Sequence, residues 1–242
     1  MSSFARISHA AFRFGAHGGA LLPFVLLLVG AGGNAVPASP APASEPVAGA
    51  RVERAPLPPE VAQIDRILAE RAPELGLALR WRVAAAIIEE SKAAGFDPLL
   101  VLGLIEVESE FDGVAVSWAG ARGLMQLRPV TAGYLAELEG VRLTTEEIYR
   151  DPALQVRLGV RYLARLQKRF RSLDLALMAY NAGPEKLRQS LATGDIERFR
   201  NYPRAVRRNH ARFRNAVRLA QENALAQADP VAGFPSDEMA TP

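Results

Sequence analysis

The apolar residues of this chain recur at helical spacing over most of its length, and the alternation typical of β-strands is scarce. In EVAQIDRILAERA, for example, the valine, the first isoleucine and the leucine fall on one helical face. Helix boundaries are also marked. Gly95 is placed to end one helix, and Asp97-Pro98 supplies an N-cap followed by proline at the first helical position. The sequence therefore predicts a mainly α, compact single domain over residues 60–225.

Two kinds of segment flank this domain. Residues 1–35 carry Arg6 and Arg13 and no acid, followed by a short apolar run and small residues, which predicts a secretory signal peptide. The run is shorter than the roughly 20 residues of a membrane-spanning helix, so an uncleaved N-terminal anchor is the second alternative and a buried helix the third. Residues 36–59, rich in proline and alanine, are expected to be a linker, and residues 226–242 a disordered tail. We therefore expect a periplasmic or otherwise exported protein, with membrane proximity if the leader stays attached.

Composition and charge remove several classes of function. The chain has 242 residues and no cysteine, which excludes a thiol nucleophile, a disulfide framework and a zinc ribbon. Its net charge is +3, and Arg6 and Arg13 of the leader contribute two of these charges, so the remainder is nearly neutral. No nucleic-acid partner is expected at this charge, although the C-terminal helix is rich in arginine. His210 is the only histidine outside the leader, so no metal or cofactor is implied.

Three glutamates, Glu106, Glu108 and Glu110, occupy every second position of the helix that Asp97-Pro98 opens. The helical neighbours of Glu108 are apolar, apart from Asp112, which follows the expected end of the helix. Glu106 and Glu110 neighbour each other, and we expect both to be solvated. Desolvation raises the pKa of a carboxyl group, and a carboxyl that is protonated near neutral pH can act as a general acid. Taken alone, Glu108 is explained at least as well by a structural ion pair with an arginine.

Three motifs favour the catalytic alternative. ESEFDGVAVSWAGARGLMQLRPVTA (108–132), MAYNAGP (178–184) and, more weakly, RNYPRAV (200–206) resemble the signature of the soluble lytic transglycosylase family of peptidoglycan-cleaving enzymes. The resemblance spans roughly residues 82–218, and the order of the motifs makes it specific. It implies a goose-lysozyme-like fold with a groove over the helix that carries Glu108.

The resemblance also implies a reaction. Glu108 would protonate the oxygen between N-acetylmuramic acid and N-acetylglucosamine, then act as base on the muramic C6 hydroxyl, which closes onto C1 to give a 1,6-anhydro sugar. An ordinary glycosidase needs two carboxylates. Glu110 is expected to be solvated, Asp112 follows the expected end of the helix, and no further acid lies in Ser117–Thr131. A single well-placed carboxyl suits a route assisted by the N-acetyl oxygen of the substrate. Peptidoglycan glycan strands are the expected partner, and cell-wall-spanning secretion or flagellar machinery is a candidate partner.

The substrate-binding residues that the resemblance implies are Ser109, Ser117, Gly123, Met125, Gln126, Tyr180, Asn181 and Tyr202. Tyr180 is expected to orient Glu108, Asn181 to bind an N-acetyl group, and the Met-Gln pair to line the groove. A cap or packing role is an equal alternative for Ser109. Trp118, at a variable position, either stacks on a sugar or packs on the surface. The family commonly has Glu-Thr before the third motif, where this chain has arginine and phenylalanine, so Tyr202 rests on the weakest match.

Two rival functions stay open at this point. A lysozyme-like hydrolytic muramidase would keep the fold and use water as the nucleophile, which requires an acid across the groove. An inactive glycan-binding scaffold would keep the groove and lose the chemistry. The intact Glu-Ser, Met-Gln and Tyr-Asn pairs favour an active enzyme.

Overall fold

The helix α3 (Pro98–Ser109) lies at the centre of the domain, and its start follows the sequence signals. The side chain of Asp97 accepts a hydrogen bond from the backbone N–H of Leu99 at 2.9 Å, and Pro98 fills the first helical position. Residues 100–105 are all buried. A helix that is apolar on every side must be enclosed by other elements, and the remaining helices provide that enclosure.

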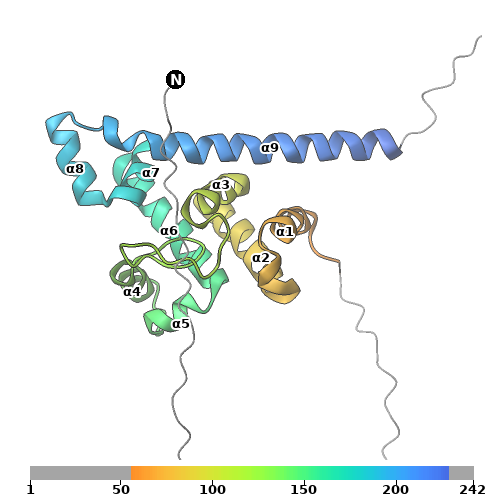
Figure 1. The fold of residues 1–242 in the computed structure, drawn as a ribbon, viewed down its shortest axis with the longest axis horizontal. Helices are drawn as coiled ribbons and strands as arrows, with labels where there is room; N and C mark the ends of the chain where they lie inside the picture. Colours follow the sequence, from red (N-terminus) through yellow and green to blue (C-terminus); the bar gives the residue numbers. More distant parts are fainter. Residues whose placement is uncertain (1–55, 229–242) are drawn as a thin grey trace, which may run out of the picture. The chain divides into compact units, whose positions relative to one another are not determined.

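The computed structural model describes residues 56–228 (Figure 1). In chain order, its elements are α1 (Pro59–Arg71), the 3-10 turn η1 (Pro73–Leu75), α2 (Gly76–Ala94), α3, α4 (Pro129–Leu138), α5 (Thr145–Tyr149), α6 (Pro152–Phe170), α7 (Leu173–Ala182), α8 (Pro184–Thr193), the 3-10 turn η2 (Glu197–Phe199) and α9 (Asn201–Ala228). Within this range there is no strand, and the bridges Val116–Arg122 and Arg122–Leu127 stand alone. The mainly α class is confirmed.

Helices from distant parts of the sequence pack in pairs around α3. α2 packs against both α1 and α6, α7 packs against α6, and α9 crosses α3 (Figure 1). The two helices approach closely at Gly103, where an added Cβ would lie 2.9 Å from both His210 N and Val206 O. Glycine therefore lets the two backbones meet without a side chain between them.

A buried charge joins α2 to α6 on the other side of the domain. Glu90 is buried, and Arg161 donates to both of its carboxylate oxygens at 2.7 Å. The same guanidinium reaches Glu139, at the end of α4, at 2.6 Å. A buried carboxylate is tolerated when it has such a partner, so this network also holds the end of α4 against α6.

The boundaries mostly follow the predicted ones. Gly95, with φ 70, ends α2 as expected. α9 continues through Ala228, three residues into the segment 226–242 that was expected to be a tail. The leader and nearly all of the 36–59 linker lie outside the described residues. Between residues 56 and 228, no helix combines the length and apolar character needed to cross a membrane.

Candidate active site

Glu108 lies in the last turn of α3 and is partly buried. Desolvation by burial raises its pKa from 4.5 to about 7, although a hydrogen bond from Tyr202 acts in the opposite direction. This agrees with its place in the apolar stripe. At neutral pH the carboxyl group is thus divided between its protonated and ionised forms, and the residue keeps part of its surface open to a ligand.

Tyr202, in the first turn of α9, donates its phenolic hydrogen to Oε1 of Glu108. Tyr180, in α7, donates instead to the backbone carbonyl of Met125 at 2.9 Å. The expectation that Tyr180 orients Glu108 therefore needs correction, because Tyr202 makes that contact. The reason is the crossing at Gly103, which brings the start of α9 to the end of α3.

Both phenols stay neutral beside the carboxyl group. Burial, and secondly the nearby charge of Glu108, raise the pKa of Tyr180 and of Tyr202 well above 10. Each can donate a hydrogen bond but neither can act as a base near neutral pH. Glu108 is thus the one group of the three that exchanges a proton in this range.

The chain turns sharply directly after α3. Glu110 and Phe111 both have left-handed backbones, with φ 52 and 70. This is unusual for a bulky side chain. Phe111 is fully buried and meets Phe213 of α9 edge-on, with ring centroids 6.1 Å apart. Backbone strain of this kind persists only where packing enforces it, and here it directs residues 112–128 back over α3.

Residues predicted to bind substrate also hold this loop in place. The hydroxyl of buried Ser109 lies 3.0 Å from the carbonyl of Leu124, which favours the packing alternative for Ser109. Gly123, with φ 72, donates its N–H to the carbonyl of Ala115 at 2.9 Å. The amide nitrogen of Gln126 donates to the same carbonyl at 3.1 Å. The loop is therefore tied to the residue next to Glu108.

Two of the remaining predicted residues are placed differently from expectation. Met125 is fully buried, so it supports the site from below and does not present a wall to the ligand. Ser117 accepts a hydrogen bond from the N–H of Ala121 at 3.0 Å and so shapes a turn. Asn181 is exposed beside Tyr180, and its side-chain amide makes no hydrogen bond within residues 56–228. It remains available to a ligand.

The floor of the site includes residues that sequence reasoning missed. A Cβ on Gly159 of α6 would lie 2.4 Å from Met125 Cε and 3.0 Å from the Tyr180 hydroxyl. One turn earlier, Gln155 is fully buried, and its amide oxygen would lie 2.0 Å from a Cβ on Gly123. The available signal was a glutamine and a glycine, four residues apart, on the apolar face of an amphipathic helix.

Glu106 corrects a second expectation, since it is not solvated. Its side chain is 12 % exposed, Arg71 of α1 approaches both carboxylate oxygens at 2.6 and 2.7 Å, and Arg212 of α9 lies at 2.9 Å. Glu110 is exposed, as expected. The helical-face argument was therefore wrong for Glu106, because it could not reveal the two arginines that approach from distant helices.

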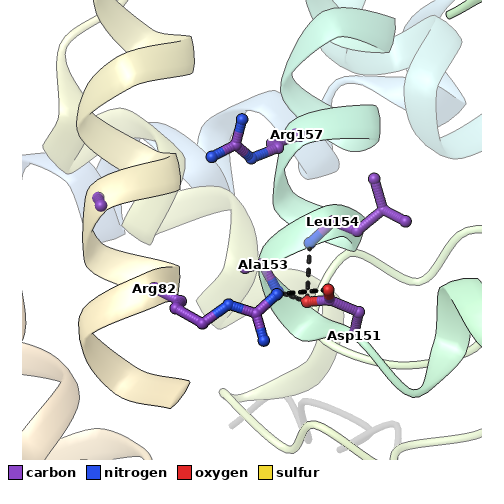
Figure 2. A pocket seen from close by; sticks show the side chains of 6 residues that line it. Arg82, Asp151, Ala153, Leu154 and Arg157 are labelled. Atoms are coloured by element: carbon purple, nitrogen blue, oxygen red, sulfur yellow. Dashed lines mark hydrogen bonds and ion pairs between the residues drawn. The ribbon is translucent and has the colours of Figure 1, made fainter. Parts of the chain in front are cut away.

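A surface pocket lies between α2 and α6, away from these residues (Figure 2). Its polar groups pair with one another: Arg82 meets Asp151 at 2.5 Å, and Asp151 in turn accepts from the N–H groups of Ala153 and Leu154. Arg157 pairs with Glu89 at 3.0 Å. These charges are already compensated and none belongs to the predicted site, so Glu108 and its surroundings are kept as the candidate active site.

Known proteins are similar to the part of the chain that contains Glu108. Residues 85–202 match the family model of the transglycosylase SLT domain. Membrane-bound lytic murein transglycosylase C from Haemophilus influenzae is 40 % identical over 79 residues, which cover 31 % of this chain and 22 % of that protein. The protein of the same name from Mannheimia succiniciproducens is 36 % identical over 105 residues, or 39 % of this chain and 29 % of that protein. The chain thus spans under a third of these relatives.

The 70 kDa soluble lytic transglycosylase SLT70 of Escherichia coli shares the fold. Its structure matches 65 % of this chain and 30 % of its own length, with a TM-score of 0.51 and 21 % identity. The family model and this shared fold agree with the motifs around Glu108. Residues 85–202 of the chain therefore match the transglycosylase SLT domain family in sequence, and the described domain shares the fold of one of its solved structures.

Proposed function

We propose that this chain is a peptidoglycan lytic transglycosylase that cleaves the β-1,4 bond between N-acetylmuramic acid and N-acetylglucosamine. The observation that carries the proposal is Glu108, a partly buried carboxyl group with a pKa of about 7, inside a transglycosylase SLT domain. The names of the relatives, which are murein transglycosylases, support peptidoglycan as the substrate.

In the first step Glu108 gives its proton to the glycosidic oxygen as the bond to muramic C1 breaks. The N-acetyl oxygen of the substrate stabilises the positive charge that develops at C1. In the second step the Glu108 carboxylate removes the proton of the C6 hydroxyl while O6 bonds to C1. The product is a 1,6-anhydro sugar, no water is consumed, and Glu108 ends protonated again. A pKa near the working pH suits a group that must act as acid and then as base.

The residues around Glu108 support this two-step mechanism. Tyr202 holds the carboxylate during the base step, because its phenol donates and stays neutral. Asn181 is free to bind the N-acetyl group that the resemblance assigns to it. Ser117, Gly123 and Gln126 shape the loop beside the groove, and Ser109 fixes it to α3.

The hydrolytic rival needs a second acid across the groove, and two of the acids nearest in sequence, Asp112 and Glu106, make other contacts. Asp112 follows the end of α3, is exposed, and accepts a hydrogen bond from the N–H of Val114 at 2.9 Å. Glu106 is held by Arg71 and Arg212. These contacts favour ring closure by the substrate's own hydroxyl over attack by an activated water.

Digestion of purified peptidoglycan in heavy-oxygen water tests the function directly. We expect muramic ends that are lighter by one water than hydrolysis products and that carry no heavy oxygen, as read by mass spectrometry. Reducing muramic ends with one heavy oxygen would establish the muramidase in place of the transglycosylase. Intact strands after prolonged digestion would favour the inactive scaffold.

Tyr202→Phe should move the pH profile of cleavage. The phenol lowers the pKa of Glu108, so its loss should raise that pKa above about 7, by roughly one unit for a hydrogen bond to a charged group. The first step needs a protonated acid, so activity falls as pH rises through this pKa. The falling limb of kcat/KM against pH should therefore shift to higher pH. The maximal activity of the variant should be at most about tenfold lower than that of the native enzyme. A limb that stays in place would exclude Tyr202 as the partner of Glu108.

We also propose that the protein acts outside the cytoplasm. The basic and apolar leader supports this, as does the occurrence of peptidoglycan in the cell wall. The relatives are named membrane-bound, and an uncleaved leader would place this enzyme at the membrane in a similar way. Fractionation of cells that produce the full chain, with mass measurement of its N-terminus, distinguishes a cleaved leader from an anchor.

A further inference from the structure

Trp118 is exposed to an extent that is unusual for tryptophan. Its exposed fraction is 97 %, the highest among the large apolar side chains of residues 56–228. Tryptophan is highly buried on average, since its ring has much apolar surface to remove from water. Of the two alternatives for Trp118, surface packing is thus ruled out. A large apolar ring that no other part of the described chain covers is a candidate ligand-binding group.

The backbone beneath Trp118 is rigid. The N–H of Gly120 donates to the Ser117 carbonyl at 3.0 Å, the N–H of Ser117 donates to the Ala121 carbonyl at 2.9 Å, and the N–H of Ala121 donates to the Ser117 hydroxyl at 3.0 Å. Gly120 closes the turn with φ 75. Trp118 therefore stands at the first central position of a tight turn, and its backbone loses little freedom when the ring binds a ligand.

This turn is coupled to the catalytic helix by the contacts described above. The carbonyl of Ala115, three residues before Trp118, accepts hydrogen bonds from Gly123 and Gln126 at 2.9 and 3.1 Å. The hydroxyl of Ser109, the residue directly after Glu108, donates a hydrogen bond to the carbonyl of Leu124. The backbone of Trp118 is thus held at a set position relative to Glu108, and not on a free loop.

The surroundings of the ring are apolar and acidic. Val114 and Val116, four and two residues before Trp118, are 85 % and 65 % exposed. Among the charged residues of the loop, Glu110 and Asp112, eight and six residues before Trp118, are exposed and form no ion pair within the described part of the chain, and Arg128, ten residues after it, is also exposed and unpaired there. The nearer cation, Arg122, is paired with Glu146 at 2.7 Å. Acidic groups disfavour an anionic lipid surface, which attracts basic segments. A neutral sugar ring, with its apolar C–H face, fits this surface better.

We infer that Trp118 is a stacking platform for a neutral N-acetylhexosamine ring of the glycan strand, beyond the two sugars that flank the cleaved bond. The inference rests on the proposed function, since it takes the glycan strand as the ligand. The indole ring would cover the C–H face of one sugar and so fix the register of a long strand over Glu108. Short fragments that do not reach the turn would not use it.

Binding by the full chain with Glu108→Gln and Trp81→Phe tests this, because Trp118 is then the sole tryptophan of the chain. Addition of long, uncrosslinked glycan strands should shift its emission to the blue. In the Glu108→Gln chain, Trp118→Ala should weaken binding of long strands by about three- to tenfold, which is the size of an aromatic stacking contact. Trp118→Phe should recover most of that loss. Val130→Ala, which removes a comparably exposed side chain from α4, is the matched control and should leave binding unchanged.

In the otherwise native enzyme, Trp118→Ala should lower kcat/KM for long strands by a similar factor and leave it unchanged for the shortest cleaved fragment. An unmoved emission spectrum at saturation, or equal losses on long and short substrates, would overturn the platform. Anhydro products would still support the proposed function in that case. A blue shift with phosphatidylglycerol vesicles and none with glycan would replace the sugar by a lipid surface. If the native chain releases no anhydro product and binds no glycan, both proposals fail together.

Discussion

Glu108→Gln should reduce cleavage of peptidoglycan by at least 10²–10⁴-fold, roughly the contribution of a positioned acid–base group. The amide can neither give up a proton to the glycosidic oxygen nor accept one from the C6 hydroxyl. Because glutamine has the shape of a protonated glutamic acid, folding and glycan binding should persist. Product release followed by mass spectrometry, together with binding of uncleaved strands, measures both. A variant with near-native turnover would remove Glu108 from the mechanism.

The same substitution should stabilise the folded chain at neutral pH. The pKa of Glu108 rises from 4.5 to about 7 on folding, so the folded state binds this proton more tightly than the unfolded state. The native enzyme should therefore be most stable below pH 4.5, as far as this group is concerned, and should lose stability as pH rises towards 7. This difference between the folded and unfolded pKa destabilises the native fold at high pH by at most about 3 kcal/mol. Glutamine does not ionise, so the variant does not lose this stability.

Urea unfolding of both chains at about pH 5 and pH 8 gives the measurement. The advantage of Glu108→Gln should be small at the lower pH and larger at the higher one. Glu110→Gln is the matched control, because Glu110 is exposed and two residues away. Its stability should not depend on pH in this way, and its activity should change by a few-fold at most. An advantage of Glu108→Gln that shrinks as pH rises would contradict the burial of this carboxyl group.

Local sequence rules predicted the ends and the faces of helices, because these depend on neighbours along one segment. Asp97-Pro98 and Gly95 marked helix boundaries correctly, and the apolar neighbours of Glu108 indicated its raised pKa. What could not be predicted was which distant helix would meet each face. Arg71 and Arg212 reach Glu106 from 35 residues upstream and 106 downstream, and no periodicity within α3 encodes them.

The correction that Tyr202, and not Tyr180, contacts Glu108 has the same origin. Both residues were identified from motifs, but a motif does not say which hydroxyl points at the carboxylate. That depends on the depth of the α3–α9 crossing, which Gly103 sets. A glycine inside a strongly apolar helix was the available signal. Glycine has low helix propensity, so a glycine inside a helix usually serves a packing or functional purpose. The purpose of Gly103 becomes clear only when the partner helix α9 is known.

Gly103→Ala should therefore damage both the fold and the site. The added Cβ would meet backbone atoms of α9, His210 N and Val206 O, at 2.9 Å. Backbone cannot rotate away as a side chain can, so α9 must shift. His210 is held to Asp97 at 2.7 Å, which resists that shift. Overpacking of this kind destabilises a domain by about 1–3 kcal/mol.

Activity should fall further than stability accounts for. Tyr202 begins the same helix and reaches Glu108 only if α9 keeps its place on α3. We expect a loss of roughly 10–100-fold per folded molecule, since misplaced catalytic groups lose up to about 10²-fold. The falling limb of the pH profile should also move upwards, as in Tyr202→Phe, because the phenol no longer lowers the pKa of Glu108. This shift separates a displaced Tyr202 from a general loss of folded protein.

Gly133→Ala is the matched control for this change, because Gly133 also lies inside a helix, α4, where an added Cβ would meet Thr145 Cγ2 at an ordinary 3.8 Å. With space available, the alanine should stabilise the chain by up to about 1 kcal/mol through helix propensity alone. The two glycines would then show opposite signs for the same substitution. A Gly103→Ala enzyme with native stability, native activity and an unmoved pH limb would show that the close crossing of α3 and α9 does not position Tyr202.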